Sequence, residues 1–284
     1  MEKQFPRTMV GGVSMPRMLI GSNWLLGYSH TGAAADKAIK EKFSTLDAFL
    51  PVFEAYLRHG IDAVMAPISS TPIMADAISY AEDKLGKKII RIDTPWINVD
   101  DTAEARRQSE EIIKHSADIG CTFCLIHHAS AEQLVNKNKR EITRLPDYLS
   151  MIRAHGLIPG LSAHMPELVT YSDLNEYDVE TYIQIFNCMG FLMQVEIESV
   201  ARIIHNAKKP VMTIKPFAAG RCTPFVGLNF NWNVLRPCDM ITVGANSADE
   251  ALEDIEISFA ALERRMPDLS ARSSPVKQEI LGHK

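Results

Sequence analysis

Residues 121–128 read CTFCLIHH, a short apolar run that ends in two histidines. Similar runs occur along the chain at residues 17–21, 61–66, 88–93, 157–162, 181–186, 210–215 and 240–243. Each run is bounded by Gly, Pro, Asp, Asn or His, which is typical of strands that are buried on both faces. The pattern therefore predicts eight buried strands.

Between these runs, the apolar residues recur at helical spacing. The spacing predicts helices over residues 46–57, 102–119 and 247–265. In the last of these, Ser247 is the expected N-cap and Glu250, three residues later, completes a capping box. Eight strands that alternate with helices indicate parallel βα units.

Two architectures have this alternation, a closed (β/α)8 barrel and an open, doubly wound sheet. An open sheet that binds a dinucleotide carries GxGxxG after its first strand, whereas residues 21–27 read GSNWLLG. The length of 284 residues is close to the barrel norm of about 250. We therefore predict an α/β fold of the (β/α)8 TIM-barrel type, with residues 1–284 as one domain. Its polar tail, residues 267–284, is expected to be either loose or a contact within a homo-oligomer.

The composition excludes several classes of protein. Hydrophobic residues make up 46% and charged residues 23%, which excludes a disordered chain. The net charge of −5 argues against a nucleic-acid partner. We find neither a signal peptide nor an apolar run of about 18 residues, so we expect a cytoplasmic protein without a membrane partner. The C-x-x-C at Cys121 and Cys124 is interpreted as two buried thiols.

The candidate catalytic residues are those at the ends of the predicted strands, because barrel enzymes carry their chemistry there. His127 and His164 follow neighbouring strands, and histidine serves both as an acid/base group and as a metal ligand. Side chains alternate along a strand, so we expect only one of His127 and His128 to face the barrel axis. Asp93 is the expected partner, either as a hydrogen-bonding group or as the third ligand of a divalent metal with His127 and His164. The alternative is that the histidines are structural and that Asp93 caps a helix.

A second group of polar residues suggests substrate binding. Lys215 ends the seventh run, where a lysine is an anion clamp, a Schiff-base amine or a side chain that reaches solvent. Arg221, together with the start of the last helix, suggests a cradle for phosphate or carboxylate. The remaining candidates at the strand ends are Asn23, Trp24, Gln184 and Asn187.

Several segments together resemble the aldo/keto reductase superfamily, from about residue 17 to residue 265. They are LIGSNW (19–24), LIH (125–127), GLS (160–162), QIFN (184–187), MTIKPFAAGR (212–221) and TVGANS (242–247). The resemblance implies the same barrel fold, and it implies carbonyl reduction with a nicotinamide cofactor.

The catalytic tetrad that the resemblance implies is mostly replaced. The family uses an Asp, a Tyr proton donor, a Lys and a His, and only the His is retained, at His127. The positions of the other three are occupied by Met65, Ser70 and Thr94, and Ala163 stands where the family has a nicotinamide-binding Asn. Without a proton donor of suitable pKa, ordinary hydride transfer is not expected.

We therefore expect a small-molecule enzyme with its site at the mouth of the barrel. Its chemistry would be non-redox, either acid/base or metal-assisted, as in a lyase, isomerase or hydrolase. The expected substrate is a polar carbonyl or sugar-like compound, with anionic compounds among the candidates. One alternative is a divergent NAD(P)-dependent oxidoreductase in which His164 or Tyr28 donates the proton and Gln184 and Lys215 contact the cofactor. Another is a non-catalytic ligand-binding barrel. The sequence identifies no cofactor, and it favours a divalent metal over NAD(P).

Overall fold

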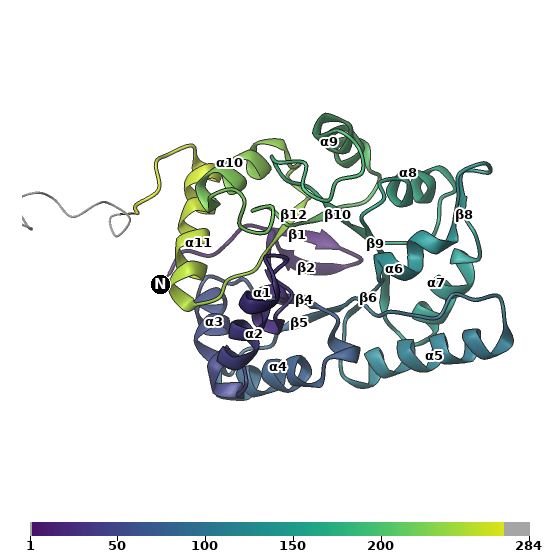
Figure 1. Ribbon diagram of the computed structural model, residues 1–284, viewed down its shortest axis with the longest axis horizontal. Helices are drawn as coiled ribbons and strands as arrows, with labels where there is room; N and C mark the ends of the chain where they lie inside the picture. Colours follow the sequence, from purple (N-terminus) through teal and green to yellow (C-terminus); the bar gives the residue numbers. More distant parts are fainter. Residues whose placement is uncertain (1, 270–284) are drawn as a thin grey trace, which may run out of the picture.

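A closed barrel of parallel strands forms the centre of the computed structural model, which describes residues 2–269 (Figure 1). Its strands, in chain order, are β3 (Met18–Gly21), β4 (Ala63–Ala66), β5 (Ile90–Asp93), β6 (Phe123–Ile126), β9 (Ile158–Ala163), β10 (Thr181–Ile185), β11 (Val211–Ile214) and β12 (Met240–Val243). Neighbours along the chain pair in parallel, and β12 pairs with β3 to close the barrel. Each strand coincides with one of the eight predicted runs to within two residues at either end, so the (β/α)8 barrel is confirmed.

Helices surround the barrel. They are α1 (Asn23–Leu26), α2 (Ala33–Lys42), α3 (Leu46–Arg58), α4 (Pro72–Leu85), α5 (Ala103–Asp118), α6 (His128–Ala131), α7 (Leu145–Ala154), α8 (Glu167–Leu174), α9 (Ile197–Asn206), α10 (Pro224–Val234) and α11 (Ala248–Glu263). The three predicted helices correspond to α3, α5 and α11. At the start of α11 the Ser247 hydroxyl accepts the Glu250 N–H at 3.2 Å. The Glu250 carboxylate in turn accepts the N–H of Asn246 at 2.7 Å, one residue before the N–H that the capping box predicts.

Side chains alternate along the barrel strands between the barrel interior and the helix layer. The interior cluster contains Leu19, Ala63, Met65, Ile92, Phe123, Leu125, Ile183, Met212 and Met240. The residues between them belong to the larger cluster that packs against the helices, as Tyr182 and Ile241 do. The position of a residue relative to this alternation decides whether it reaches the mouth.

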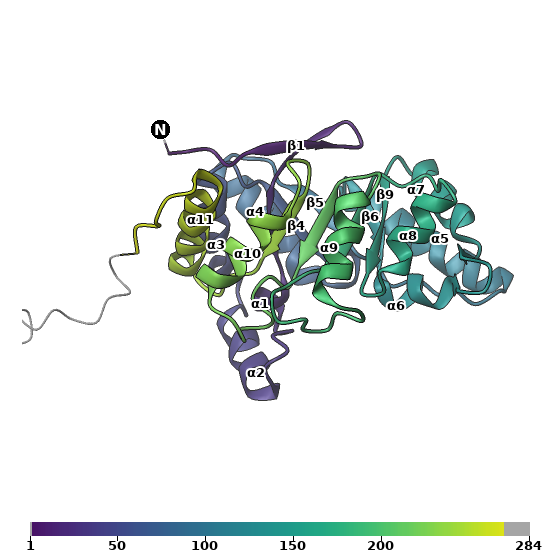
Figure 2. The same ribbon diagram turned by 90° about the horizontal axis from the view of Figure 1, so that it is seen from above.

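An N-terminal hairpin, which the sequence did not predict, closes the end of the barrel opposite the mouth. It consists of β1 (Arg7–Val10) and β2 (Val13–Pro16), paired antiparallel. Its side chains Val10 and Met15 are buried and belong to the interior cluster. Figure 2 shows this hairpin on one side of the barrel and α1 and α2 on the other. A smaller antiparallel pair, β7 (Val135–Asn136) and β8 (Glu141–Ile142), lies in the loop between α6 and α7.

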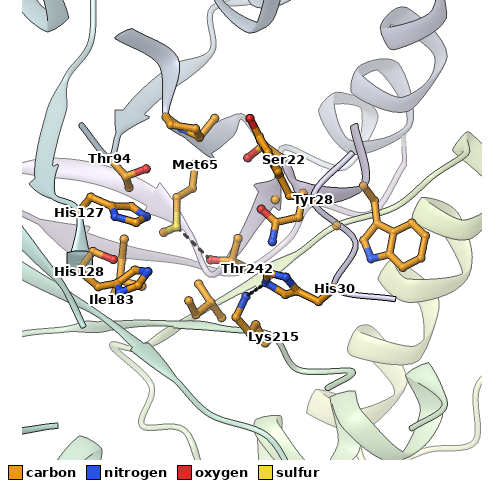
Figure 3. Close-up of a pocket in the computed structure, with 18 of the residues that line it drawn as sticks. Ser22, Tyr28, His30, Met65, Thr94, His127, His128, Ile183, Lys215 and Thr242 are labelled. Carbon is orange, nitrogen blue, oxygen red and sulfur yellow. Dashed lines mark hydrogen bonds between the residues drawn. The ribbon is translucent and has the colours of Figure 1, made fainter. Parts of the chain in front are cut away.

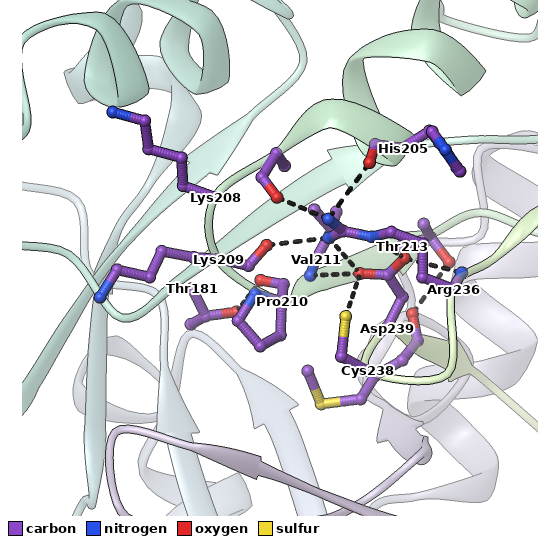
Figure 4. Close-up of polar contacts among 12 residues, drawn as sticks. Thr181, His205, Lys208, Lys209, Pro210, Val211, Thr213, Arg236, Cys238 and Asp239 are labelled. Carbon is purple, nitrogen blue, oxygen red and sulfur yellow. Dashed lines mark hydrogen bonds and ion pairs between the residues drawn. The ribbon is translucent and has the colours of Figure 1, made fainter.

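A buried aspartate connects the starts of three barrel strands through its carboxylate and its backbone carbonyl (Figure 4). Asp239, fully buried before β12, accepts the N–H of Val211 at 2.9 Å and the guanidinium of Arg236 at 2.7 Å. Its own carbonyl accepts Nε–H of Arg17, the residue before β3, at 3.0 Å. This network is at the N-terminal ends of the strands, where barrels place residues that serve stability.

Three further expectations concern segments outside the barrel mouth. Most of the predicted tail, residues 270–284, lies outside the described residues. In residues 2–269, no helix combines the length and apolar character needed to cross a membrane. Cys121 and Cys124 are free and buried, as predicted.

Candidate active site

A cavity of about 460 Å³ opens at the C-terminal ends of the barrel strands. The described residues that line it include no Asp or Glu. Its titratable side chains are Tyr28, His30, His127, His128, His164 and Lys215. The mouth therefore gathers histidines and one lysine, with no carboxylate among the described residues that line the cavity.

His127 lies directly after β6, as the N-cap of α6. Its Nδ1 accepts the N–H of Ala129 at 3.2 Å, so the neutral ring carries its proton on Nε2. Burial, and then the nearby His128, lower the pKa of His127 to about 4. The ring of Trp96 meets it edge-on at 5.2 Å between centroids. At neutral pH the imidazole is therefore uncharged and held in one tautomer.

His128 also lines the cavity, which corrects the expectation that only one of the two adjacent histidines faces the axis. Strand alternation does not apply to this pair, because β6 ends at Ile126 and His128 is already the first residue of α6. The His128 ring stacks on that of His164, with centroids 3.6 Å apart and planes at 17°. Burial, then His128 and Lys215, lower the pKa of His164 to about 3.

A carboxylate behind the histidines fixes the loop that carries His164. Oε1 of Glu132 accepts the backbone N–H groups of His164 and Met165, both at 2.7 Å. Its Oε2 is 3.9 Å from Nδ1 of His128. Burial raises the pKa of Glu132, but His128 and the two backbone N–H groups outweigh it and hold that pKa below its ordinary value. An ionised Glu132 thus orders the histidine cluster from outside the cavity.

Lys215 lies across the cavity from His127 and His128 (Figure 3). Its Nζ is 2.5 Å from Nε2 of His30, a residue of the loop between α1 and α2. Burial lowers the pKa of Lys215 to about 8. Burial and the charge of Lys215 lower the pKa of His30 as well. The two side chains form a basic pair in which the histidine is neutral at pH 7.

Asn23 and Trp24, at the start of α1, line the cavity as predicted residues of the mouth. The ring of Trp24 approaches the backbone of Gly244 so closely that a Cβ there would be 3.3 Å from its Cδ1. A glycine at the end of the eighth strand therefore lets the indole lie against the cavity wall. Trp24, Phe217 and Gly244 also line a neighbouring hollow.

The structure does not bring Asp93 to the histidines. Its carboxylate is fully buried on the outer side of the barrel, where it accepts the hydroxyl of Ser116 at 2.5 Å and the N–H of Ser69 at 3.2 Å. The next residue, Thr94, lines the cavity instead. Burial raises the pKa of Asp93. The predicted partnership of Asp93 with His127 and His164 is therefore wrong.

Three other predicted binding residues also lie outside this cavity. Gln184 follows Ile183, which faces inward, and so its buried side chain faces the helix layer. The Asn187 side chain orders its own loop, since its Oδ1 accepts the N–H of Phe191 at 2.9 Å. Arg221 stacks on the Phe191 ring at 4.0 Å and lines the neighbouring hollow.

The predicted anion cradle at Arg221 is not supported. The same hollow contains Glu250 and Asp254, both from α11. The carboxylate of Glu250 already accepts the N–H of Asn246 before this helix. An anion would meet negative charge where the cradle was expected.

The donor set for a metal ion is also absent from the described part of the chain. No three side chains of His, Cys, Asp or Glu within residues 2–269 are arranged to hold an ion. In the cavity, His128 and His164 stack face to face, and Asp93 lies outside it. The proposed ligands His127, His164 and Asp93 therefore do not form one site.

Two residues of the site, His30 and His128, were not among the predicted site residues. His30 is in a loop whose path the sequence does not determine, although a loop after the first strand must pass the mouth. His128 could have been found by ending the sixth strand one residue earlier.

Comparisons with known proteins show similarity in fold at low sequence identity. Neither a family model nor a curated protein sequence matches this chain. A solved structure described as a proposed aldo-keto reductase of Pseudomonas aeruginosa is similar, with a TM-score of 0.62 and 14% identity over 92% of this chain and 97% of that one. Aldose reductase of Giardia lamblia is similar with a TM-score of 0.53 and 11% identity, over 94% of this chain and 90% of that one. Ribulose-1,5-bisphosphate carboxylase/oxygenase of Pyrococcus horikoshii is similar with a TM-score of 0.57 and 12% identity, over 99% of this chain and 69% of that one. The fold thus resembles aldo-keto reductases and other TIM barrels.

The four positions that the sequence resemblance assigns to the reductase tetrad do converge. Met65, Ser70, Thr94 and His127 all line the cavity. The Met65 sulfur accepts the hydroxyl of Thr242 at 3.8 Å (Figure 3). Three of the four positions, however, offer no group that donates a proton near neutral pH.

The residues present do not fit a nicotinamide cofactor held as in the reductases. Gln184, expected to contact it, faces the helix layer, and Ala163 packs in the outer core. The cavity therefore lacks the amide contacts that the resemblance implies for holding a nicotinamide ring.

Proposed function

We propose that this chain is an enzyme of non-redox acid/base chemistry that acts, in this cavity, on a small carbonyl compound bearing a carboxylate or phosphate. The observation that carries the proposal is the set of neutral histidines that shares one cavity with a lysine and no acidic side chain.

Lys215 supports the anionic substrate. An ammonium group removed from water is costly unless a negative charge accompanies it. Among the described lining residues no carboxylate takes that place. A carboxylate or phosphate on the substrate would complete the pair and bring the carbonyl between Lys215 and the histidines.

His127 and His164 support the acid/base step. A general base works best when its pKa is near the working pH, and both histidines have a pKa well below 7. Part of that lowering comes from positive neighbours, including Lys215. An anion bound beside Lys215 would offset its charge and raise the pKa of both rings. Substrate binding would thereby make them better proton acceptors.

The two alternative functions have less support. The divergent reductase requires contacts from Gln184 that the cavity does not offer. A mouth blocked by side chains would favour a non-catalytic barrel, whereas this mouth is an open cavity of about 460 Å³.

Proton exchange observed by NMR tests the proposal without knowledge of the final product. The protein is incubated in D2O with a panel of 2-oxo acids and phosphorylated hydroxyketones, and loss of the signal from protons next to the carbonyl is followed. We expect exchange or conversion of at least one compound, reduced about 10²- to 10⁴-fold in His127→Ala or His164→Ala.

His115→Ala is the matched control, because His115 is an exposed histidine on α5 away from the cavity. This variant should retain full activity. Absence of exchange and conversion across the panel, or full activity in both cavity variants, would overturn the proposal.

A further inference from the structure

We propose that Lys215 is a covalent catalytic residue, whose amine forms an imine with an aldehyde or ketone substrate while His30 accepts the proton that the amine must lose. This inference rests on the proposed function and narrows its substrates to compounds with a free carbonyl group.

The contact between Lys215 and His30 shows which nitrogen accepts the hydrogen bond from the ammonium group. Nζ of Lys215 and Nε2 of His30 are 2.5 Å apart. An ammonium group can only donate, so Nε2 of His30 is unprotonated whenever Lys215 is charged. A proton acceptor is thus in place on the amine before any substrate enters.

The backbone of both residues is in the left-handed region, which the surrounding structure must maintain. Lys215 has φ of +61° and His30 has φ of +59°, in the left-handed region that side chains with a Cβ rarely adopt. Lys215 also precedes Pro216, which further restricts its backbone. Such strain costs about 1–3 kcal/mol per residue and is concentrated at functional sites.

The loop that carries His30 is fixed by its own hydrogen bonds. Oδ1 of Asp36 on α2 accepts the Ser29 N–H at 2.8 Å and the Ser29 hydroxyl at 2.6 Å. The Ser29 hydroxyl is also 2.7 Å from that of Thr31. His30, between these two residues, is therefore positioned by the fold rather than by its contact with Lys215.

The surroundings of Lys215 increase the fraction of its neutral amine relative to a lysine in water. The titratable groups that line the cavity with it are Tyr28, His30, His127, His128 and His164. No carboxylate among the described lining residues stabilises the ammonium, and burial lowers its pKa to about 8. Roughly one molecule in ten therefore carries the free amine at pH 7.

The reaction balances without a further reagent. The nitrogen lone pair of the neutral amine attacks the carbonyl carbon, and the C=O π electrons move to oxygen. His30 takes a proton from nitrogen and returns one to that oxygen, which gives a carbinolamine. Protonation of its hydroxyl releases water and leaves the iminium ion. One amine, one carbonyl and one proton thus yield one iminium ion and one water.

The iminium ion explains why neutral histidines lie across the cavity. Its positive nitrogen withdraws electrons from the bond to an adjacent C–H or C–C group. His127 or His164 can then accept the proton released from carbon or from a hydroxyl group.

Reductive trapping tests the covalent step directly. The full chain is incubated with pyruvate or with dihydroxyacetone phosphate, reduced with sodium cyanoborohydride, and analysed by intact mass and peptide mapping. We expect one adduct per chain, heavier by the mass of the probe less one oxygen atom, on Lys215.

Three variants make the test specific. Lys215→Arg keeps the positive charge but cannot form an imine, so it should lose both the adduct and turnover. Lys139→Arg replaces an exposed lysine outside the cavity and should retain both. His30→Asn, which tolerates the left-handed backbone, should form the adduct about 10²-fold more slowly. Circular dichroism and thermal unfolding confirm that each variant is folded.

The outcomes separate the two proposals. No adduct on Lys215, or turnover in a folded Lys215→Arg within threefold of wild type, overturns the imine. Persistence of proton exchange that depends on His127 and His164 would then leave the proposed function standing. An adduct on Lys215 without exchange or conversion of any compound would support the imine and overturn the acid/base function. An unchanged trapping rate in His30→Asn would remove His30 from the step.

Discussion

The imidazoles of His128 and His164 stack face to face, 3.6 Å between centroids, and so join the loops that follow β6 and β9. These strands are neighbours in the barrel. A positive charge on one ring disfavours a positive charge on a ring stacked against it, and His128 is among the groups that lower the pKa of His164.

The pKa of His164 should therefore rise when its neighbour cannot be charged. In His128→Phe the ring stack is kept and the titrating nitrogens are lost. Because His128 is one of the groups that lower the pKa of His164, we expect that pKa to increase, as measured by NMR titration of the imidazole nitrogens. An unchanged or lower value would show that the stack does not couple the two groups.

The stability of the fold should decrease on acidification because of His127 and His164. The pKa values of His127 and His164 are about 4 and about 3 in the folded chain, against about 6.5 when unfolded. Below pH 6.5 the unfolded chain therefore binds more protons, so this contribution is complete above pH 6.5 and lost as the pH falls towards 4.

The comparison that isolates this effect uses a His127→Gln/His164→Gln double variant, which cannot titrate at these positions. The Tm of wild type should fall more than that of the variant between pH 7.5 and pH 5. Equal decreases would show that these histidines do not contribute.

Asp93 should be required for stability and not for turnover. Asp93→Asn places an amide where the carboxylate accepts Ser116 and Ser69, so we expect a loss of about 1–3 kcal/mol in urea unfolding. Activity per folded molecule should be unchanged, because the side chain does not reach the cavity. A large decrease in kcat with stability intact would restore Asp93 to the site.

Titration with NADPH should give no saturable change in protein fluorescence. Trp24 lines the cavity, so a nicotinamide ring bound there would alter its emission. We expect no saturation up to millimolar cofactor. Saturable quenching, absent when Trp24 is replaced by Phe, would favour the reductase alternative.

The fold could be predicted because each barrel strand is a separate apolar run. The hairpin β1–β2 could not, since most residues of its strands are not buried and the surface that buries Val10 and Met15 forms only when the barrel closes. A local pattern carries no signal for a partner that the rest of the chain must first assemble.

The site was predicted only in part because position on a strand and direction of a side chain are different properties. The ends of the strands brought His127, His164 and Lys215 to the mouth. Asp93 and Gln184 are also near strand ends but are one residue out of phase with the inward-facing Thr94 and Ile183. Counting alternate residues from the interior cluster would have excluded both.

The N-terminal hairpin adds Val10 and Met15 to the interior cluster, which fills the barrel below the cavity. Substrate, product and any water released by condensation therefore enter and leave the cavity at the C-terminal ends of the strands, because Val10, Met15 and the rest of the interior cluster fill the other end. A product molecule that remains in the cavity therefore prevents the next substrate molecule from entering. We therefore expect the product to inhibit competitively with respect to substrate.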